Sequence, residues 1–472
     1  MSPTITGLSS LSLQLTKSRF AIRQGESLLY LASILAYAVS SALALTVAGG
    51  TLMFFQRAAN PTGLLAEALA EDPTFDVFLT MYAVLAVVAC ALLIPSLAGL
   101  AGSAAVLGAR GRERRLAALR LLGLSAGDVT RMSLIDALIQ AVIGCAAGTA
   151  AYFATLPLWG NLTMQAVPVD PAEMLLPWFG VLGILAATVV IGLVASWWGL
   201  RQVRISPLGV ARRGSRPGLK VWRPIAFVAL LGIAIAGSSA VPLGATLVPW
   251  LVIGGFLIVV VWGLNLVAPW VLQHVSRLVA QAPWPSLVWA ARRVQANPKA
   301  TWQQVSGIAL LCFISGYVAM MPVSLASAEG GASQSVIEGA VHDFTKGALI
   351  TLAVGLALAA TSVLINQASA VLERAEQARA LDKMGSPRSF LTKASWLETL
   401  GPLVLGMALG VGLGAGMAGP VARLAATAGE STLGPLLLGT VLALGLALVC
   451  GALLASRPLQ TQVLGTLERR AD

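Results

Sequence analysis

Long apolar runs recur along this chain, separated by short polar segments. The runs at 28–55, 79–108 and 347–365 reach or exceed the roughly 20 apolar residues that a helix needs to cross a bilayer core. They lack the alternating polarity of transmembrane strands, so helices are the expected spanning element. The pattern predicts an all-α integral membrane protein with about ten transmembrane helices, at residues 28–55, 79–107, 129–157, 177–199, 224–240, 247–268, 302–324, 346–370, 391–419 and 434–455.

The composition agrees with this interpretation. Of the 472 residues, 57% are hydrophobic and only 11% are charged, which leaves too little polar surface for a soluble domain. The net charge of +11 would suggest nucleic acid as a partner of a soluble protein. Here the basic residues lie in short loops between apolar runs, so they report topology, and we expect no nucleic-acid partner.

The charges of the loops also predict the orientation. With the N-terminus inside, the outer loops carry 3 of the 31 basic residues, namely Arg57, Lys346 and Arg423. The same loops carry half of the 20 acidic residues. Because Lys and Arg collect on the cytoplasmic side, we expect both termini to be cytoplasmic.

No catalytic or metal-binding pattern is evident. The four cysteines lie inside apolar runs without CxxC spacing, and His274 and His342 are isolated, so no metal cluster is expected. The phosphate-binding pattern G-x-x-x-x-G-K-[ST] does not occur, and neither does an arrangement that suggests hydrolysis. We expect a non-catalytic chain without a cofactor of its own.

The chain contains an internal repeat with an offset of 262 residues. The loop 108–128 and the helix after it align without a gap with the loop 370–390 and its following helix. Polar positions match as well as apolar ones, which an Ala-, Leu- and Gly-rich background does not explain. The matched pairs include Leu119 and Leu381, Gly123 and Gly385, Thr130 and Thr392, Arg131 and Lys393, Ser133 and Ser395, and Asp136 and Glu398.

The repeat predicts the domain organisation. Basic amphipathic stretches at 11–23 and 287–301 are expected to lie as helices in the cytoplasmic interface, each just before a span. We divide the chain into a first repeat at 8–213, a linker with inserted spans five and six at 214–286, and a second repeat at 287–470. Each repeat then holds four spans. Because the insert is a pair of spans, both repeats keep the same orientation in the membrane.

The loop at 110–125 has the pattern of a short amphipathic helix. Leu116 and Leu119 share one face, arginines present charge, and Gly123 ends the helix. A rigid helix between two long spans suits a docking element for another protein. The alternative is a solvated basic loop that only follows the positive-inside rule, and charge alone favours that alternative.

This loop resembles the signature of FtsX-like permeases, the membrane subunits of ABC transporters of the MacB type, or type VII. The resemblance consists of a basic residue and Glu, an apolar helix, then Leu-Arg-x-Leu-Gly and Ser. It is carried here by Arg112, Glu113, Ala117, Leu119, Arg120, Leu122, Gly123 and Ser125.

The second copy of the loop is weaker. It keeps Leu381 and Gly385 in register, whereas Glu376 and Lys383 fall one place late. With ten spans the chain looks similar to BceB-type permeases. It departs from them because it has only residues 323–345 where they carry a large extracellular domain.

The resemblance implies partners and a location. It implies a separate cytoplasmic ABC ATPase in two copies, which binds ATP and Mg, while one permease chain forms the whole transmembrane unit in the bilayer of a bacterial cell membrane. Coupling helices at 110–123 and 372–385 receive the stroke of the ATPase. The ATPase-coupling residues so implied are Arg112, Glu113, Arg115, Leu116, Leu119, Arg120, Gly123, Glu376, Leu381, Lys383 and Gly385.

Spans three and nine carry glycines at matching places, which allow helices to approach closely. They form a helix-packing seam, either between the two halves, where it would slide during a cycle, or as ordinary packing between helices. These glycines are Gly144, Gly148, Gly406, Gly410 and Gly414. Asp136 and Glu398 lie about two turns into the same spans, and we expect each to pair with a coupling-helix arginine near the cytoplasmic interface.

Three functions fit this sequence. The first is an ABC permease that exports or extracts a hydrophobic or amphipathic compound, such as an antimicrobial peptide, a lipid or a drug, and so provides antimicrobial resistance. The second is a regulatory mechanotransmitter of the cell-division FtsX kind, which acts on an extracytoplasmic partner. The short outer loops count against the second. The third is a secondary transporter, which usually shows broken helices and buried mid-membrane charges that this sequence lacks.

Overall fold

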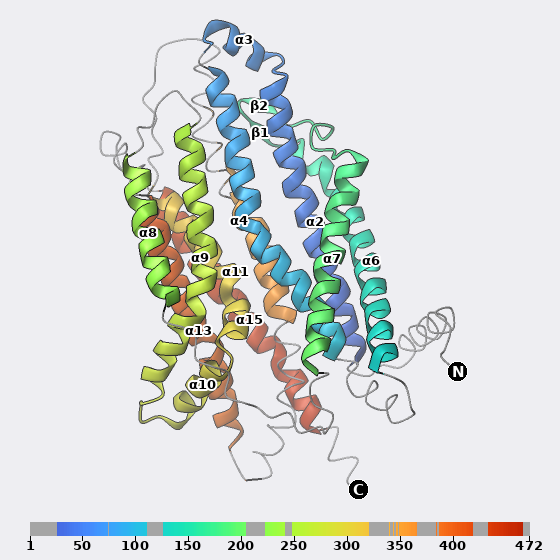
Figure 1. Cartoon of the computed structure of the whole chain (residues 1–472), viewed down its shortest axis with the longest axis vertical. Coiled ribbons are helices and arrows are strands. Elements are labelled where there is room, and N and C mark those ends of the chain that lie inside the picture. The colour runs from blue at the N-terminus through green and yellow to red at the C-terminus, as the bar shows by residue number, and fades with distance from the viewer. Residues whose placement is uncertain are drawn as a thin grey trace.

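The computed structural model describes most of the chain, and nearly all of the described residues are helical. They are residues 26–73, 75–110, 126–203, 222–240, 248–320, 339, 343, 346–347, 349–365, 384, 387–418 and 433–465. The long helices run side by side, with the short helix α3 at one end and α10 at the other (Figure 1). We refer to these as the α3 end and the α10 end.

The first half of the chain contains four long helices that all contact one another, and α2 packs most extensively, against α4 and α6. Helix α3 (Leu64–Glu71) and a two-stranded antiparallel hairpin, β1 (Thr163–Met164) and β2 (Val167–Pro168), lie in the connections at the α3 end. The four long helices are α2 (Glu26–Ala59), α4 (Phe75–Arg110), α6 (Ala126–Trp159) and α7 (Trp178–Val203).

The second half begins with α10, which two prolines separate from its neighbours. Pro285 and Pro298 occupy the first positions of α10 and α11, where the missing N–H has no helical partner to lose. Asn297 precedes the second proline and is therefore pushed out of the helical region. The helices are α10 (Pro285–Ala296), α11 (Pro298–Ala319), a helix at 349–365, α13 (Arg388–Met417) and α15 (Leu433–Gly465).

The inserted pair of helices joins the two halves. Helix α8 (Trp222–Ala240) packs on α9 (Val248–Val279), and α9 contacts α4 of the first half and α10, α11 and α13 of the second. Val260 and Leu264 of α9 are buried in the same core as Val88 of α4 and Leu310 of α11. The insert is therefore a bridge between the halves, and its helix α9 belongs to the common core.

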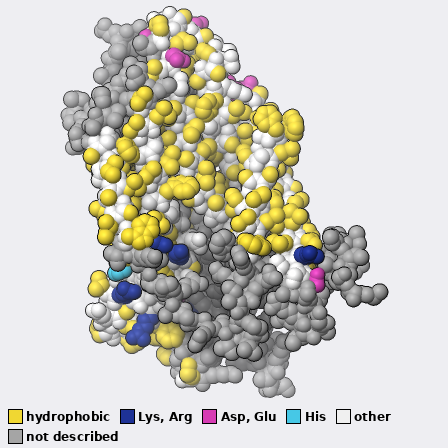
Figure 2. All heavy atoms as spheres, viewed as in Figure 1, with side chains coloured by type: hydrophobic (Ala, Val, Ile, Leu, Met, Phe, Trp, Pro, Cys, Tyr) yellow, Lys and Arg dark blue, Asp and Glu magenta, His cyan; other side chains and the backbone are white. Residues whose placement is uncertain are grey.

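The helices have the length and surface of membrane spans. In the described part of the chain seven helices are long and apolar enough to cross a bilayer, and shorter apolar helices at 222–237, 349–365 and 438–454 occupy the other three expected positions. Figure 2 shows a broad belt of hydrophobic side chains over these helices, with Asp and Glu beyond it at the α3 end. The predicted all-α membrane architecture is confirmed.

Several boundaries differ from those that hydropathy predicted. Helix α9 continues through Pro269 to Val279, well past the expected end at 268. The interfacial stretch predicted at 287–301 is divided, because residues 287–296 lie in α10 and residues 298–301 begin α11. Its counterpart at 11–23 lies outside the described residues. Helix α3 and the hairpin occupy connections that were expected to be plain loops.

The glycines of the predicted seam bring α6 against α2 and α13 against α11. A Cβ built at Gly148 would collide with the carbonyl oxygen of Ala38, and one at Gly410 with the carbonyl oxygen of Ala309. The other glycines of the pattern face the same partner helices; these are Gly144, Gly406 and Gly414. The seam thus lies between helices of the same half, so at these positions the structure favours packing within a half over a seam between halves.

The two helix contacts share one geometry. At Gly148 an added Cβ would also lie 3.0 Å from the backbone nitrogen of Ala42, four residues after Ala38. At Gly410 an added Cβ would lie 3.1 Å from the backbone nitrogen of Phe313, four residues after Ala309. Each glycine therefore sits over one turn of its partner's backbone, at equivalent places in the two halves.

This packing predicts a large difference between two glycines of α13. Gly410→Leu should lower the stability by about 1–3 kcal/mol, because the side chain has to push α11 away. The matched control is Gly412→Leu, since nothing lies within 4 Å of a Cβ built there. Thermal unfolding of the purified variants in detergent measures both. Equal unfolding temperatures for the two variants would contradict the close contact.

Candidate functional site: a polar clamp at the α3 end

A buried arginine holds the hairpin onto the end of α2. Arg57, in the last turn of α2, is only 5% exposed. Its guanidinium donates from Nε and Nη2 to the Glu173 carboxylate, at 2.9 and 2.7 Å. It also donates to the carbonyl oxygens of Met164 (2.8 Å) and Pro168 (2.9 Å). One planar cation thus satisfies a carboxylate and both strands of the hairpin.

The turn of the hairpin has an unusual backbone conformation. Gln165 and Ala166 both have φ near +60°, as in the two-residue turns of type I′ that usually contain glycine or asparagine. For other L-residues the left-handed conformation costs roughly 1 kcal/mol or more. The turn therefore needs support from its surroundings.

That support comes from a carboxylate of the second half of the chain. Asp343, which is 4% exposed, accepts hydrogen bonds from the Gln165 backbone N–H (2.6 Å) and the Tyr82 hydroxyl (3.2 Å). Its other oxygen lies 3.3 Å from the Lys346 ammonium. Lys346 donates in turn to the carbonyl oxygen and the hydroxyl of Thr163, at 2.6 and 2.8 Å.

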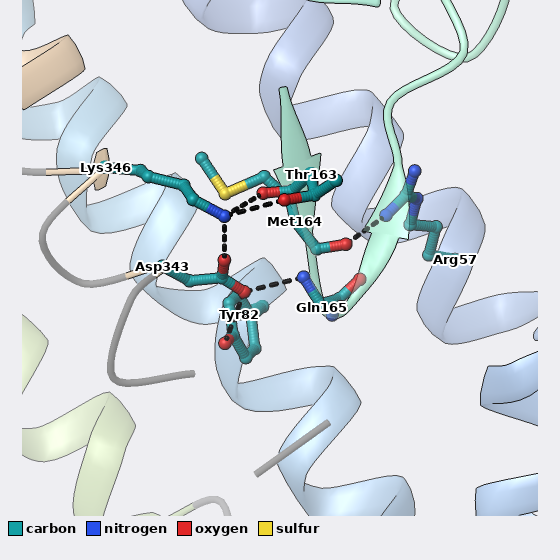
Figure 3. A network of polar contacts seen from close by, with 7 residues as sticks. All are labelled: Arg57, Tyr82, Thr163, Met164, Gln165, Asp343 and Lys346. Atoms are coloured by element: carbon teal, nitrogen blue, oxygen red, sulfur yellow. Dashed lines mark hydrogen bonds and ion pairs between the residues drawn. The ribbon is translucent and has the colours of Figure 1, made fainter. Parts of the chain in front are cut away.

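We call this set of five residues the polar clamp; they are Tyr82, Thr163, Gln165, Asp343 and Lys346 (Figure 3). Three parts of the chain that are distant in sequence meet there: α4, the hairpin, and the segment between α11 and the helix at 349–365. Both oxygens of the buried carboxylate have partners, as a buried charge requires. Removing one partner of such a group typically costs about 3–5 kcal/mol, so the clamp is a strong joint between the halves.

The chain after the hairpin is fastened as tightly. The Tyr152 hydroxyl of α6 donates to the carbonyl oxygen of Met174 (2.5 Å) and accepts from the Leu176 N–H (3.2 Å). A Cβ at Gly49 of α2 would touch the same Met174 carbonyl. The hairpin and the segment that follows it are thus held by α2 and α6, the helix pair of the first glycine contact.

At the α10 end, α10 is fixed to the beginning of α13. Arg293 of α10 forms an ion pair with Glu398 of α13 at 3.1 Å, and the rings of Trp289 and Phe390 meet edge to face. The described partner of Glu398 is therefore an arginine of the interfacial helix, whereas we had expected one from a coupling helix. Asp136, the matching carboxylate of α6, is 3% exposed.

The other predicted functional residues cannot be compared with the structure. The ATPase-coupling residues of both loops lie outside the described residues. The described part of the chain contains no group of three or more His, Cys, Asp or Glu side chains that could hold a metal ion.

Sequence reasoning counted Arg57, Asp343 and Lys346 as outer charges but did not predict the clamp. The sequence did contain a signal. Of the three basic residues assigned to the acid-rich outer loops, two are Arg57 and Lys346, which pair with Glu173 and Asp343 in the structure. A cation on the side that membrane topology disfavours is expected to have a specific partner. Tyr82 and Gln165 gave no such signal.

The comparisons with known proteins agree with this architecture. Residues 101–208 and 349–463 each match the family model described as FtsX-like permease C-terminal. The first match covers the end of α4 with α6 and α7, and the second covers the helix at 349–365 with α13 and α15. No curated protein and no solved structure matches the chain.

The apolar helices make this chain a multi-pass membrane protein. Two separate matches to one permease model identify its class further: in both segments the chain is similar to the FtsX-like permeases. Members of this family are generally non-catalytic transmembrane subunits of ABC-type transporters that work with an ATPase.

The Arg57 network predicts a strong effect of one substitution. Arg57→Met keeps an unbranched apolar stem but leaves Glu173 and two carbonyl oxygens without their donor. We expect a loss of about 2–4 kcal/mol in stability, measured by thermal unfolding of the purified protein. Arg292→Met, at an exposed arginine of α10, is the matched control and should change little. An Arg57→Met protein that unfolds like the control would show that the network contributes nothing.

Proposed function

We propose that this chain is the permease subunit of an ABC transporter that exports or extracts a hydrophobic or amphipathic compound. The observation that carries the proposal is the position of the two family matches. Each contains one of the predicted coupling helices, the first at 110–123 and the second at 372–385. Two docking elements on one chain suit an ATPase dimer, with one permease forming the transmembrane unit.

The charge distribution supports an orientation. The connections at the α3 end carry acidic residues such as Glu67, Glu71 and Asp170, whereas α10 carries only basic ones. By the positive-inside rule the α10 end faces the cytoplasm and both termini are cytoplasmic. The similarity to FtsX-like permeases supports a bacterial cell membrane as the location.

The described helices suggest how a stroke reaches the outer end. ATP binding closes the ATPase dimer and moves the two coupling helices. Each precedes a helix, α6 or α13, that is packed backbone to backbone on its partner, so each pair moves as one body. The polar clamp joins the outer ends of the two halves, and its release opens a path between them.

The substrate class follows from what the spans lack. The middle parts of the described spans carry no Asp, Glu, Lys or Arg, so a hydrophilic solute would find no lining that replaces its water. Antimicrobial peptides, lipids and lipophilic drugs remain the candidates, which makes antimicrobial resistance the expected role. The alternative is a mechanotransmitter for an extracytoplasmic partner. Such a protein would transport no compound when it is reconstituted in a membrane.

The coupling helices provide the first test. Leu119→Asp places a charge on the apolar face that should contact the ATPase, and Leu381→Asp does the same in the second copy. Each variant should remain in the membrane and lose at least about tenfold in ATPase binding, because burying an unpaired charge costs several kcal/mol. Co-purification of the ATPase and its stimulated ATP hydrolysis are the measurements. Normal binding and stimulation in both variants would remove these loops as the docking site.

A reversible cross-link tests the role of the polar clamp. The Cβ of Ala166 lies 3.5 Å from a Cβ built at Gly339, within the range of a disulfide. In a background without the native cysteines, Ala166→Cys with Gly339→Cys should form a bond that locks the hairpin to the second half. Oxidation should stop export while ATPase binding persists, and a membrane-impermeant reductant added outside intact cells should restore export.

The single-cysteine variants are the controls and should export under oxidising conditions. Full export by the cross-linked protein would mean that the clamp stays closed throughout the cycle. Failure of the external reductant, when a permeant one succeeds, would reverse the proposed orientation.

A further inference from the structure

The inserted helices α8 and α9 lie outside both matched segments, and their packing places an unusual set of side chains together. A Cβ at Gly263 of α9 would meet the ring of Phe227 of α8, and a Cβ at Gly237 of α8 would meet the ring of Phe256 of α9. These two contacts fix an antiparallel register between the helices.

The register brings three polar side chains to the α10 end of this helix pair. Arg223 precedes Phe227 by one helical turn, so it lies on the face of α8 that packs on α9. Trp270 and His274 follow Gly263 by seven and eleven residues, which places them on the face of α9 that packs on α8.

These side chains offer hydrogen-bond donors that lack acceptors. Arg223 Nε and Trp270 Nε1 are both shielded from water and have no partner within the described part of the chain. His274 stacks on Trp270, with ring centroids 3.9 Å apart, and its Nδ1 donates to the Trp270 carbonyl oxygen at 2.9 Å. Shielded donors without acceptors cost about 1–3 kcal/mol each, and more when charged, so an acceptor from outside the protein would be strongly favoured.

No acidic side chain of α8, α9 or α10 can serve as that acceptor. The sequence contains no Asp or Glu between Glu173 and Glu329, a stretch that includes all of α8, α9 and α10. The described basic residues Arg223, Arg277 and Arg292 therefore meet no carboxylate from their own helices. Glu398 of α13, which reaches α10, is paired with Arg293. The charged side chains of α8, α9 and α10 are all basic, which favours an anionic occupant.

The level of the cluster identifies where the anion comes from. Trp222, next to Arg223, is 55% exposed, and exposed tryptophans mark the headgroup level of a bilayer. Figure 2 shows Lys, Arg and His side chains just below the hydrophobic belt, over the lower ends of α8 and α9. Phospholipid phosphates lie at this level.

We propose that Arg223 and Trp270 bind the phosphate of an anionic phospholipid between α8 and α9, with the Trp270 ring held in place by the stacked His274. The guanidinium fork matches two phosphate oxygens, and the indole N–H donates to a third. An anionic lipid is favoured over a zwitterionic one, because α8, α9 and α10 carry no carboxylate to hold an ammonium or choline group. Since α9 bridges the two halves, the lipid stabilises the bridge. This proposal depends on neither the cargo nor the ATPase.

The experiment measures lipid binding to the purified, delipidated full chain in detergent. Native mass spectrometry counts bound lipids, and thermal unfolding reports stabilisation by phosphatidylglycerol, phosphatidylcholine or inorganic phosphate. Phosphatidylglycerol should raise the unfolding temperature, and phosphatidylcholine and inorganic phosphate at equal concentration should not. Arg223→Gln should weaken phosphatidylglycerol binding roughly tenfold or more, as expected for the loss of a charged hydrogen-bond donor.

Two matched variants separate a site from general charge attraction. Trp270→Phe keeps the stacked ring and removes only the N–H, so the protein should fold and bind phosphatidylglycerol more weakly. Arg292→Gln makes the same charge change as Arg223→Gln at an exposed position of α10 and should retain binding. Equal losses for Arg223→Gln and Arg292→Gln, equal stabilisation by both lipids, unchanged binding by Trp270→Phe, or the same effect with inorganic phosphate would each overturn the proposal.

Discussion

The contact of one helix backbone with another, at Gly148 on α2 and at Gly410 on α11, is the constraint on which the rest of this structure depends. Inside a bilayer, apolar side chains gain nothing by leaving lipid for protein, so helices associate through close packing. Glycine permits that packing because it brings no Cβ between the backbones. The same pair of helices forms in each half, and the other spans pack around the two pairs.

Two further devices hold the halves to one another, and they differ in kind. Within the apolar belt the joint is helix α9, whose aliphatic side chains share a core with α4 and α11. At the α3 end the joint is polar, because Asp343 collects donors from α4 and from the hairpin. An apolar contact tolerates sliding, whereas a buried ion pair holds only at the correct distance and orientation. The two joints thus suit a hinge region and a latch, respectively.

Hydropathy was sufficient to predict most of the fold. The apolar runs predicted the spans, the glycine spacing predicted close contacts, and the basic amphipathic stretch at 287–301 predicted a short separate helix before a span. Which surface the glycines face was not predictable, because spacing shows that a helix has a narrow side but does not show what packs there. The extension of α9 past Pro269 was also missed, since proline is tolerated in membrane helices where neighbours satisfy the freed carbonyl.

The candidate site was less predictable than the fold, for a physical reason. The polar clamp joins residues such as Gln165 and Asp343, 178 positions apart, through bonds to the backbone that leave no pattern in the sequence. The left-handed turn at Gln165 and Ala166 was equally hidden, because neither residue type is usual there. For the predicted ATPase-coupling residues the situation is reversed. The sequence pattern suggests them, but they lie outside the described residues.

The left-handed turn has a thermodynamic consequence. Because its main support is a carboxylate from the other half of the chain, the folding of the hairpin and the association of the halves are linked equilibria. Linkage is reciprocal. A ligand that binds the ordered hairpin also favours contact between the halves. Separation of the halves in turn disfavours the ordered hairpin, by the same coupling free energy. Order in the hairpin and contact between the halves at the α3 end therefore rise and fall together.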